Sequence, residues 1–214
     1  MSKINKKLLI SIILNLLIVV FEIIGVVLSI RRRGVEAFLF YTELVNYLTL
    51  VISLIYVIFG FVALKKNTKT ANWLHNLRYA STVCLILTFM VVLCILVPIT
   101  PSEFGFYFFG DSNLYQHFLC PILAIVSFMF FESERKLNKK TILFGIFPTL
   151  IYGLILISLN LCKVLVGPYP FFYVYDMPWY ATTLLLAGIF TLAFFISWLA
   201  LFVHNRQFKR HNKV

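Results

Sequence analysis

The run AFLFYTELVNYLTLVISLIYVIFGFVAL, residues 37–64, decides the fold class of this protein. A helix needs about 20 apolar residues to cross the ~30 Å hydrocarbon layer of a bilayer, and this run is longer than that. Near its start, however, it carries Thr42, Glu43 and Asn46. Lipid does not solvate such groups, so we expect these side chains to face the interior of a helical bundle.

The rest of the chain repeats this pattern. Of its 214 residues, 61% are hydrophobic and 13% are charged, a composition that excludes an ordinary soluble domain. The predicted spans are residues 8–30, 37–64, 77–97, 114–131, 141–162 and 180–203. Because the runs are long and continuous rather than alternating, they predict helices and not a transmembrane β-barrel. The connectors are short, so we expect an all-α protein in which residues 1–214 form one bundle of six transmembrane helices.

The net charge of +11 is explained by membrane orientation rather than by nucleic acid binding. Fifteen of the 19 Lys and Arg residues fall on the side of the predicted bundle that carries both termini. The positive-inside rule therefore predicts that both termini are cytoplasmic, as in a multi-pass protein of the cell membrane. The triplet Arg31-Arg32-Arg33 falls on the outer side, against this rule.

Polar residues gather in the predicted outer halves of the spans, whereas the inner halves read as mostly apolar. The outer group comprises Glu22, Glu43, Asn46, Asn160 and Lys163, of which Glu43 is close enough to the surface to reach the headgroups. Ionisable groups at membrane depth usually face a bundle interior or a wet cavity, so this one-sided distribution predicts a pocket that opens toward the outer leaflet.

Thr42 and His117 are the candidate catalytic residues of this pocket. Each lies four residues, about 6 Å along a helix, below the predicted outer end of its span. A threonine hydroxyl needs a nearby base to become a nucleophile, and neutral imidazole is suited to that task. We expect Asn46 or Lys163 to stabilise an oxyanion, and Glu22 or Asp176 to orient the imidazole ring. A pair at this depth would meet the ester groups of membrane lipids or other fatty acyl esters.

Two short elements are similar to a known family. Residues 40–46, FYTELVN, resemble the F-x-T-x-x-(S)-N element of the six-span androgen-induced-gene family, and residues 117–121, HFLCP, resemble its H-x-x-x-P element. The resemblance implies a threonine hydrolase of fatty acid esters of hydroxy fatty acids, with Thr42 as nucleophile and His117 as its partner. Glu43 and Val45 depart from the family pattern. The abundance of Phe, Ile and Lys suggests a bacterial member, in the plasma membrane.

Other kinds of function remain as alternatives. A transporter could use Glu22, Glu43 and His117 as a proton or ion path, but such a path should continue through the inner half of the bundle. A scaffold without catalytic activity would use the same polar groups only to hold helices together. The sequence has no Gly-rich phosphate loop and no metal-spaced His and Cys set, so we expect no cofactor or metal. We expect His75, His204 and His211 to be solvated.

Overall fold

The computed structural model describes residues 3–211, which are mostly helical and include no β-strand. Four of the spans are single helices: α1 (Lys3–Arg33), α2 (Tyr41–Lys65), α7 (Thr141–Leu161) and α8 (Trp179–His211). The third span is α3 (Asn72–Val91) continued by η2 (Val92–Leu96) and α4 (Val97–Ile99). The fourth span is made of η4 (Leu114–Leu119), α6 (Cys120–Val126) and η5 (Ser127–Phe131). Within this part of the chain, six helices are long and apolar enough to cross a membrane. This confirms the predicted all-α, six-span fold class.

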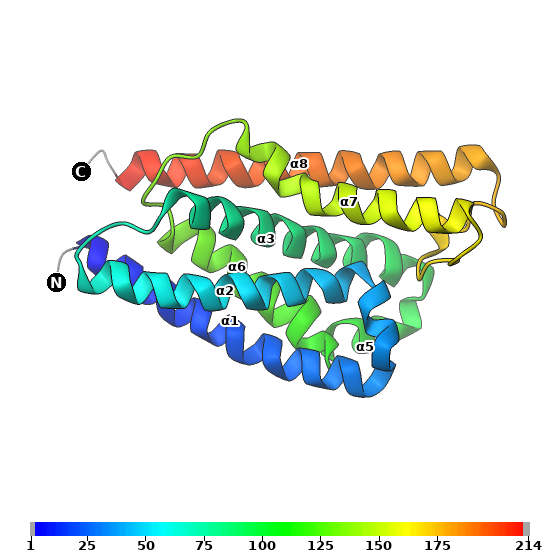
Figure 1. Cartoon of the computed structure of the whole chain (residues 1–214), viewed down its shortest axis with the longest axis horizontal. Coiled ribbons are helices and arrows are strands. Elements are labelled where there is room, and N and C mark those ends of the chain that lie inside the picture. Colours follow the sequence, from blue (N-terminus) through cyan, green and yellow to red (C-terminus); the bar gives the residue numbers. More distant parts are fainter. Residues whose placement is uncertain (1–2, 212–214) are drawn as a thin grey trace.

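The bundle is organised around α3, which contacts α2, α7, α8 and the fourth span. The described chain begins and ends at the same end of the bundle, at the left in Figure 1, and we call this the termini end. The opposite far end carries η1 (Gly34–Leu39), η3 (Pro101–Glu103), α5 (Phe104–Phe109) and η6 (Pro170–Phe172). The far end therefore gathers the connectors that follow the first, third and fifth spans.

The second span starts later than its hydropathy predicts. The chain reverses at Gly34, whose φ of +59° suits glycine, and passes through η1 before Phe40 adopts an extended conformation. The helix α2 then begins at Tyr41, so residues 37–39 belong to the turn and not to the span. Thr42 consequently lies in the first helical turn, and its predicted depth, counted along a helix from Phe38, is wrong.

Apolar and polar side chains are distributed as in a protein solvated by lipid. Large hydrophobic residues such as Ile13, Leu54, Phe147 and Leu184 are exposed on the outside of the bundle, whereas many polar residues are buried. Lipid tails offer no hydrogen bonds, so polar side chains are stabilised where they meet each other or the backbone between helices. The apolar outside is thus the surface that the bilayer covers.

A buried ion pair joins the spans in the half of the bundle toward the termini end. Arg78 of α3 and Glu132, which follows η5, are both 0% exposed, and their charged atoms lie 3.0 Å apart. Arg78 also donates to Ser53 at 3.1 Å, and Glu132 accepts from Asn15 and Ser127 at 3.0 and 2.7 Å. The expectation of a mostly apolar inner half is wrong here. Arg78 and Glu132 adjoin polar connectors in the sequence, and only packing shows that they turn inward.

Two histidines that we expected to be solvated are buried beside this network. The Nε2 atoms of His75 and His204 lie 3.2 Å apart, and the His204 ring stacks on Phe128 at 4.6 Å between centroids. His204 Nε2 is also 3.0 Å from the Arg135 carbonyl, and a carbonyl only accepts, so this nitrogen carries the proton. The prediction is therefore wrong for both residues, and the side chain of His211 lies outside the described part.

The ion pair between Arg78 and Glu132 leads to a prediction about stability. Arg78→Met or Glu132→Met alone leaves a buried charge without its partner, and each should lower the free energy of unfolding by about 3–5 kcal/mol. The double variant removes both charges and should be less destabilised than either single variant. Unfolding in detergent, followed by circular dichroism, measures the three differences. Lys66→Met, at an exposed position, is the control, and a double variant at least as unstable as either single variant would contradict the prediction.

Candidate functional site

Thr42 is fixed by two polar contacts at the start of α2. The N–H groups in the first turn of a helix have no partner within the helix, and that of Thr42 donates to the hydroxyl oxygen of Tyr169 at 3.4 Å. The side-chain amide of Asn46 donates to the Thr42 carbonyl at 2.6 Å. Thr42 is 8% exposed, so it is held near the surface of the far end without being fully enclosed.

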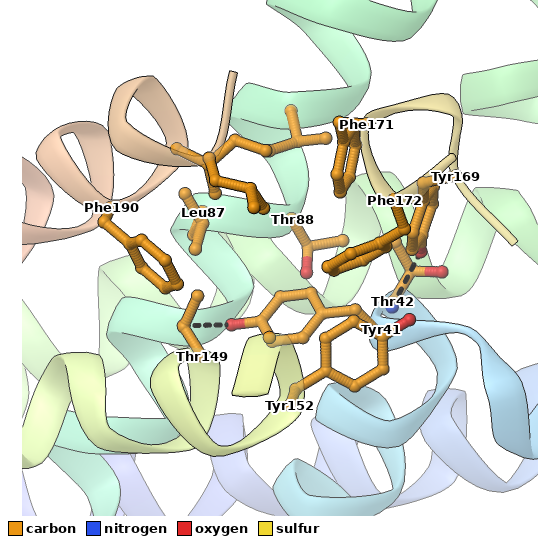
Figure 2. A pocket seen from close by; sticks show the side chains of 14 residues that line it. Tyr41, Thr42, Leu87, Thr88, Thr149, Tyr152, Tyr169, Phe171, Phe172 and Phe190 are labelled. Atoms are coloured by element: carbon orange, nitrogen blue, oxygen red, sulfur yellow. Dashed lines mark hydrogen bonds between the residues drawn. The ribbon is translucent and has the colours of Figure 1, made fainter. Parts of the chain in front are cut away.

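Thr42 lines a small cavity between α2, α3, α7, α8 and η6. Its volume is about 40 Å³, enough for a few water-sized groups. Figure 2 shows Thr42 and Tyr169 at one side, Thr149 and Phe190 at the other, and the rings of Tyr41, Tyr152 and Phe172 between them. Tyr41 and Thr149 share a hydrogen bond of 2.7 Å. Six of the fourteen lining residues are aromatic, five are aliphatic or glycine and three are threonines, so the wall is largely apolar.

An apolar groove lies beside this cavity, between α2 and α7. It has a volume of about 500 Å³, and Tyr41 and Tyr152 line both the groove and the cavity. The other lining residues are aliphatic or aromatic apart from Pro148, and they include Phe38, Leu44, Leu48, Phe147, Ile151 and Ile155. Because exposed side chains of α2 and α7 face the bilayer, a lipid acyl chain has direct access to this groove.

His117 comes from the π-helical segment η4 of the fourth span. Pro121 has no N–H with which to bond the carbonyl four residues earlier, so the α-helical hydrogen bond to the His117 carbonyl is missing. The Nδ1 atom of His117 lies 3.0 Å from the Tyr107 carbonyl and must be the donor. Nε2 of the neutral ring then keeps its lone pair. A backbone carbonyl therefore holds the nitrogen that we expected a carboxylate, Glu22 or Asp176, to orient.

The structure brings Thr42 and His117 to the same end of the bundle without joining them. The segments that carry them, α2 and η4, pack against each other. Among the described residues, however, no hydrogen bond links the two side chains, and His117 does not line the cavity beside Thr42. Catalytic hydrogen bonds are often formed only with substrate bound, so direct pairing of the two residues stays a prediction.

The two predicted glutamates are buried between α1, α2 and η4. Glu43 accepts a hydrogen bond of 2.8 Å from Gln116, so it does not reach toward the headgroups as we expected. Glu22 is 0% exposed, and its carboxyl group lies beside the Cys120 thiol, with no oxygen or nitrogen partner within residues 3–211. The two carboxyl groups are close enough to interact electrostatically. They form an acidic cluster on a different side of α2 from the aromatic cavity.

The remaining candidates lie elsewhere. Asn160, Lys163 and Asp176 line a separate pocket of about 140 Å³, formed by the end of α7 and the connector after it. The ammonium nitrogen of Lys163 lies 5.0 Å from the centre of the Tyr175 ring. Asn46 is close to Thr42, but it bonds the Thr42 carbonyl rather than pointing an open donor at a substrate. Asn160, Lys163 and Asp176 do not line the cavity at Thr42.

Sequence reasoning missed the residues that contact the two candidates. Tyr169 and Tyr107 belong to aromatic connectors, and a general preference of aromatic side chains for the membrane interface explains such connectors without any specific role. Arg33 is a third case, since its guanidinium interacts electrostatically with both His117 and Tyr169. In the sequence, the signal that pointed to Arg33 was the position of the arginine triplet, which contradicts the positive-inside rule.

Comparison with known proteins does not assign the chain to a family. The chain matches no family model, no curated protein and no solved structure. The similarity of residues 40–46 and 117–121 to elements of the androgen-induced-gene family stays a prediction. The functional argument therefore depends on the geometry of the far end.

The contact between Glu43 and Gln116 yields a test of what Glu43 does. Glu43→Leu removes the acceptor and leaves a buried amide donor unpaired, which should lower the free energy of unfolding by about 1–3 kcal/mol. Glu43→Gln keeps an acceptor oxygen at the same place and should be less destabilised. Chemical unfolding in detergent measures both. If the free energy of unfolding falls equally in the two variants, the hydrogen bond to Gln116 is not the way in which Glu43 stabilises the protein.

Proposed function

We propose that the protein is an intramembrane hydrolase of lipid-type esters, with Thr42 as nucleophile and His117 as general base. The observation that carries the proposal is the hydrogen bond from His117 Nδ1 to the Tyr107 carbonyl. It fixes the ring and leaves Nε2 free to take a proton, as a general base requires. Thr42 supplies a hydroxyl at the same end of the bundle, on an element that packs against η4.

The reaction follows the pattern of other hydroxyl nucleophiles. As Thr42 Oγ1 attacks the ester carbonyl carbon, its proton passes to His117 Nε2. The tetrahedral intermediate then expels the alcohol, which takes that proton, and leaves an acyl-threonine ester. Water attacks this ester with His117 again acting as base, and it releases the fatty acid and restores the Thr42 hydroxyl. No cofactor takes part in these steps.

Tyr169 is the best-placed donor for the oxyanion in this scheme. Its hydroxyl oxygen accepts from the Thr42 N–H, so its own proton remains available to donate. Burial raises the pKa of the Tyr169 hydroxyl, which keeps it protonated. Asn46 is less suitable because its amide bonds the Thr42 carbonyl, and Lys163 lines a different pocket. Tyr169 therefore replaces these two residues in the proposed oxyanion site.

The groove between α2 and α7 suggests an acyl lipid as the substrate. An acyl chain in the groove would lie against Tyr41 and Tyr152, the wall shared with the cavity of Thr42. With both termini in the cytoplasm, as the charge distribution predicts, the far end would face the outer leaflet of the plasma membrane. The similarity to the androgen-induced-gene elements supports the same chemistry, and the abundance of Phe, Ile and Lys supports a bacterial member.

Replacement of Thr42 or His117 tests the proposal. Thr42→Ala and His117→Ala should each lower hydrolysis of fatty acyl esters roughly a thousandfold or more and should abolish labelling by a fluorophosphonate probe. Thr42→Ser keeps a hydroxyl and should retain both. Thr49→Ala is the matched control, because Thr49 is another buried threonine of α2. Full turnover by folded Thr42→Ala or His117→Ala would reject the assignment.

A proton or ion carrier is the second candidate function. It is favoured by buried polar groups in both halves of the bundle: Glu22 and Glu43 toward the far end, and Asn15, Arg78 and Glu132 toward the termini end. The sequence predicted too few polar groups in the inner half for such a path. Ionisable residues within a membrane bundle often mark ion pathways, and Glu22 is buried with no ion-pair partner among the described residues.

Flux measurements separate the two candidates. Proteoliposomes loaded with a pH-sensitive dye should show a proton flux that Glu22→Gln abolishes and Thr42→Ala leaves intact, if the protein is a carrier. A hydrolase should give no flux above that of empty vesicles, and Glu22→Gln should retain ester hydrolysis. Flux that persists in Glu22→Gln would remove Glu22 from any such path.

A further inference from the structure

The arginine triplet at the end of α1 is the one group of basic residues that contradicts the predicted orientation. Arg31 is exposed, as expected of a residue that only flanks a span. Arg32 and Arg33 are partly buried and lie against aromatic rings of the far end. The triplet therefore divides into one solvated residue and two that belong to the fold.

Arg33 is held in place by stacking rather than by an acid. Its guanidinium carbon lies 4.0 Å from the centre of the Phe40 ring, an arrangement that stabilises a cation on an aromatic face. Its Nε atom is buried without a hydrogen-bond partner, and no carboxylate in the described part of the chain forms an ion pair with it. A fixed guanidinium with unused donors is a binding group for an anion.

Arg32 has partners but is not saturated by them. Its NH2 atom donates to Ser112 at 2.9 Å and to Asn113 at 3.3 Å, and its NH1 atom lies 3.7 Å from Asp111. The guanidinium lies 5.3 Å from the centre of the Phe106 ring. The buried Nε atom has no hydrogen-bond partner within residues 3–211. Arg32 thus adds positive charge next to Arg33, although Asp111 and Glu43 offset part of it.

Both arginines are neighbours of the proposed catalytic residues. Each interacts electrostatically with His117, and Arg33 also interacts with Tyr169. The Phe40 ring that supports Arg33 packs against the Tyr169 ring, with centroids 5.9 Å apart. Tyr169 in turn contacts Thr42. A negatively charged group bound at Arg33 would therefore lie beside the place where Thr42 is to act.

We propose that Arg33, assisted by Arg32, binds the anionic group of an acyl lipid at the far end of the bundle. Two lipid groups offer the required chemistry: the phosphate of a phospholipid and the carboxylate of a fatty acid or fatty acyl ester. Guanidinium forms paired hydrogen bonds with both. The proposal rests on the proposed hydrolase function for one step only, namely that this bound lipid is the one presented to Thr42. It extends that function by requiring a negatively charged substrate.

Binding is measured separately from turnover, so that the two proposals can fail independently. The protein is purified in neutral detergent with Thr42→Ala as background, and lipid binding is followed by native mass spectrometry. Phosphatidylglycerol is compared with phosphatidylcholine of the same chains, and oleate with oleyl alcohol. Arg33→Gln should weaken binding of the preferred anionic lipid about tenfold or more, since it removes a charge-assisted hydrogen bond, and should leave the neutral lipids unchanged.

Arg31→Gln is the matched control, because it removes the same charge from the exposed member of the triplet. It should change binding less than about twofold, as expected of a screened surface charge. Phe40→Leu, which removes the stacking surface, should weaken anionic lipid binding as Arg33→Gln does. Preference for phosphatidylglycerol or for oleate identifies the group that is recognised. The proposal is overturned if neither is preferred over its neutral counterpart, if folded Arg33→Gln keeps the preference, or if Arg31→Gln loses it equally.

Discussion

Lipid forms no hydrogen bonds with a protein, and the arrangement of this bundle follows from where its polar groups find partners. The outside of the helices is apolar, and the polar side chains of α1, α2, α3 and the fourth span meet between them. The central position of α3 is part of this arrangement. It carries Arg78, which bonds Ser53 of α2 and pairs with Glu132 at the end of the fourth span. One buried ion pair thereby fixes the mutual positions of three spans.

The charged groups at the two ends of the bundle differ in the partners that they have. Toward the termini end, Arg78, Glu132, Asn15 and Ser127 bond one another, which is what structural residues do in an apolar medium. Toward the far end, the Nε atom of Arg33 has no hydrogen-bond partner in the described chain, and the buried carboxyl group of Glu22 lies beside the Cys120 thiol and the Glu43 carboxyl group. A buried guanidinium nitrogen without a partner and two carboxyl groups close together each cost free energy, and a bound ligand or a proton would offset that cost. Unpartnered polar atoms also occur toward the termini end, at Asn15 Oδ1 and at the Nδ1 atoms of His75 and His204, so the charged groups of the far end are the physical reason to look for function there.

The connectors of the far end, and not the spans alone, build the candidate site. The turn after Arg33 places Phe40 under the guanidinium and starts α2 just before Thr42. The connector before the fourth span supplies the Tyr107 carbonyl that fixes His117, and the connector after α7 supplies the Tyr169 hydroxyl beside Thr42. Three stretches that are distant in the sequence thus converge on one region. The spans hold these connectors together, and the groove between α2 and α7 lies beside them.

Hydropathy by itself determined the fold class and the six spans, because crossing a membrane imposes a minimum length of apolar helix that is visible in any single sequence. It also singled out Thr42, His117 and Glu22 as polar residues whose presence within apolar spans needs an explanation. Only the tertiary structure decided what each of them touches. Hydropathy could not show that Glu43 bonds Gln116, that Arg78 and Glu132 turn inward from polar connectors, or that a tyrosine carbonyl holds His117. Those contacts join different helices, and the distance between side chains on separate helices depends on packing, which hydropathy does not encode.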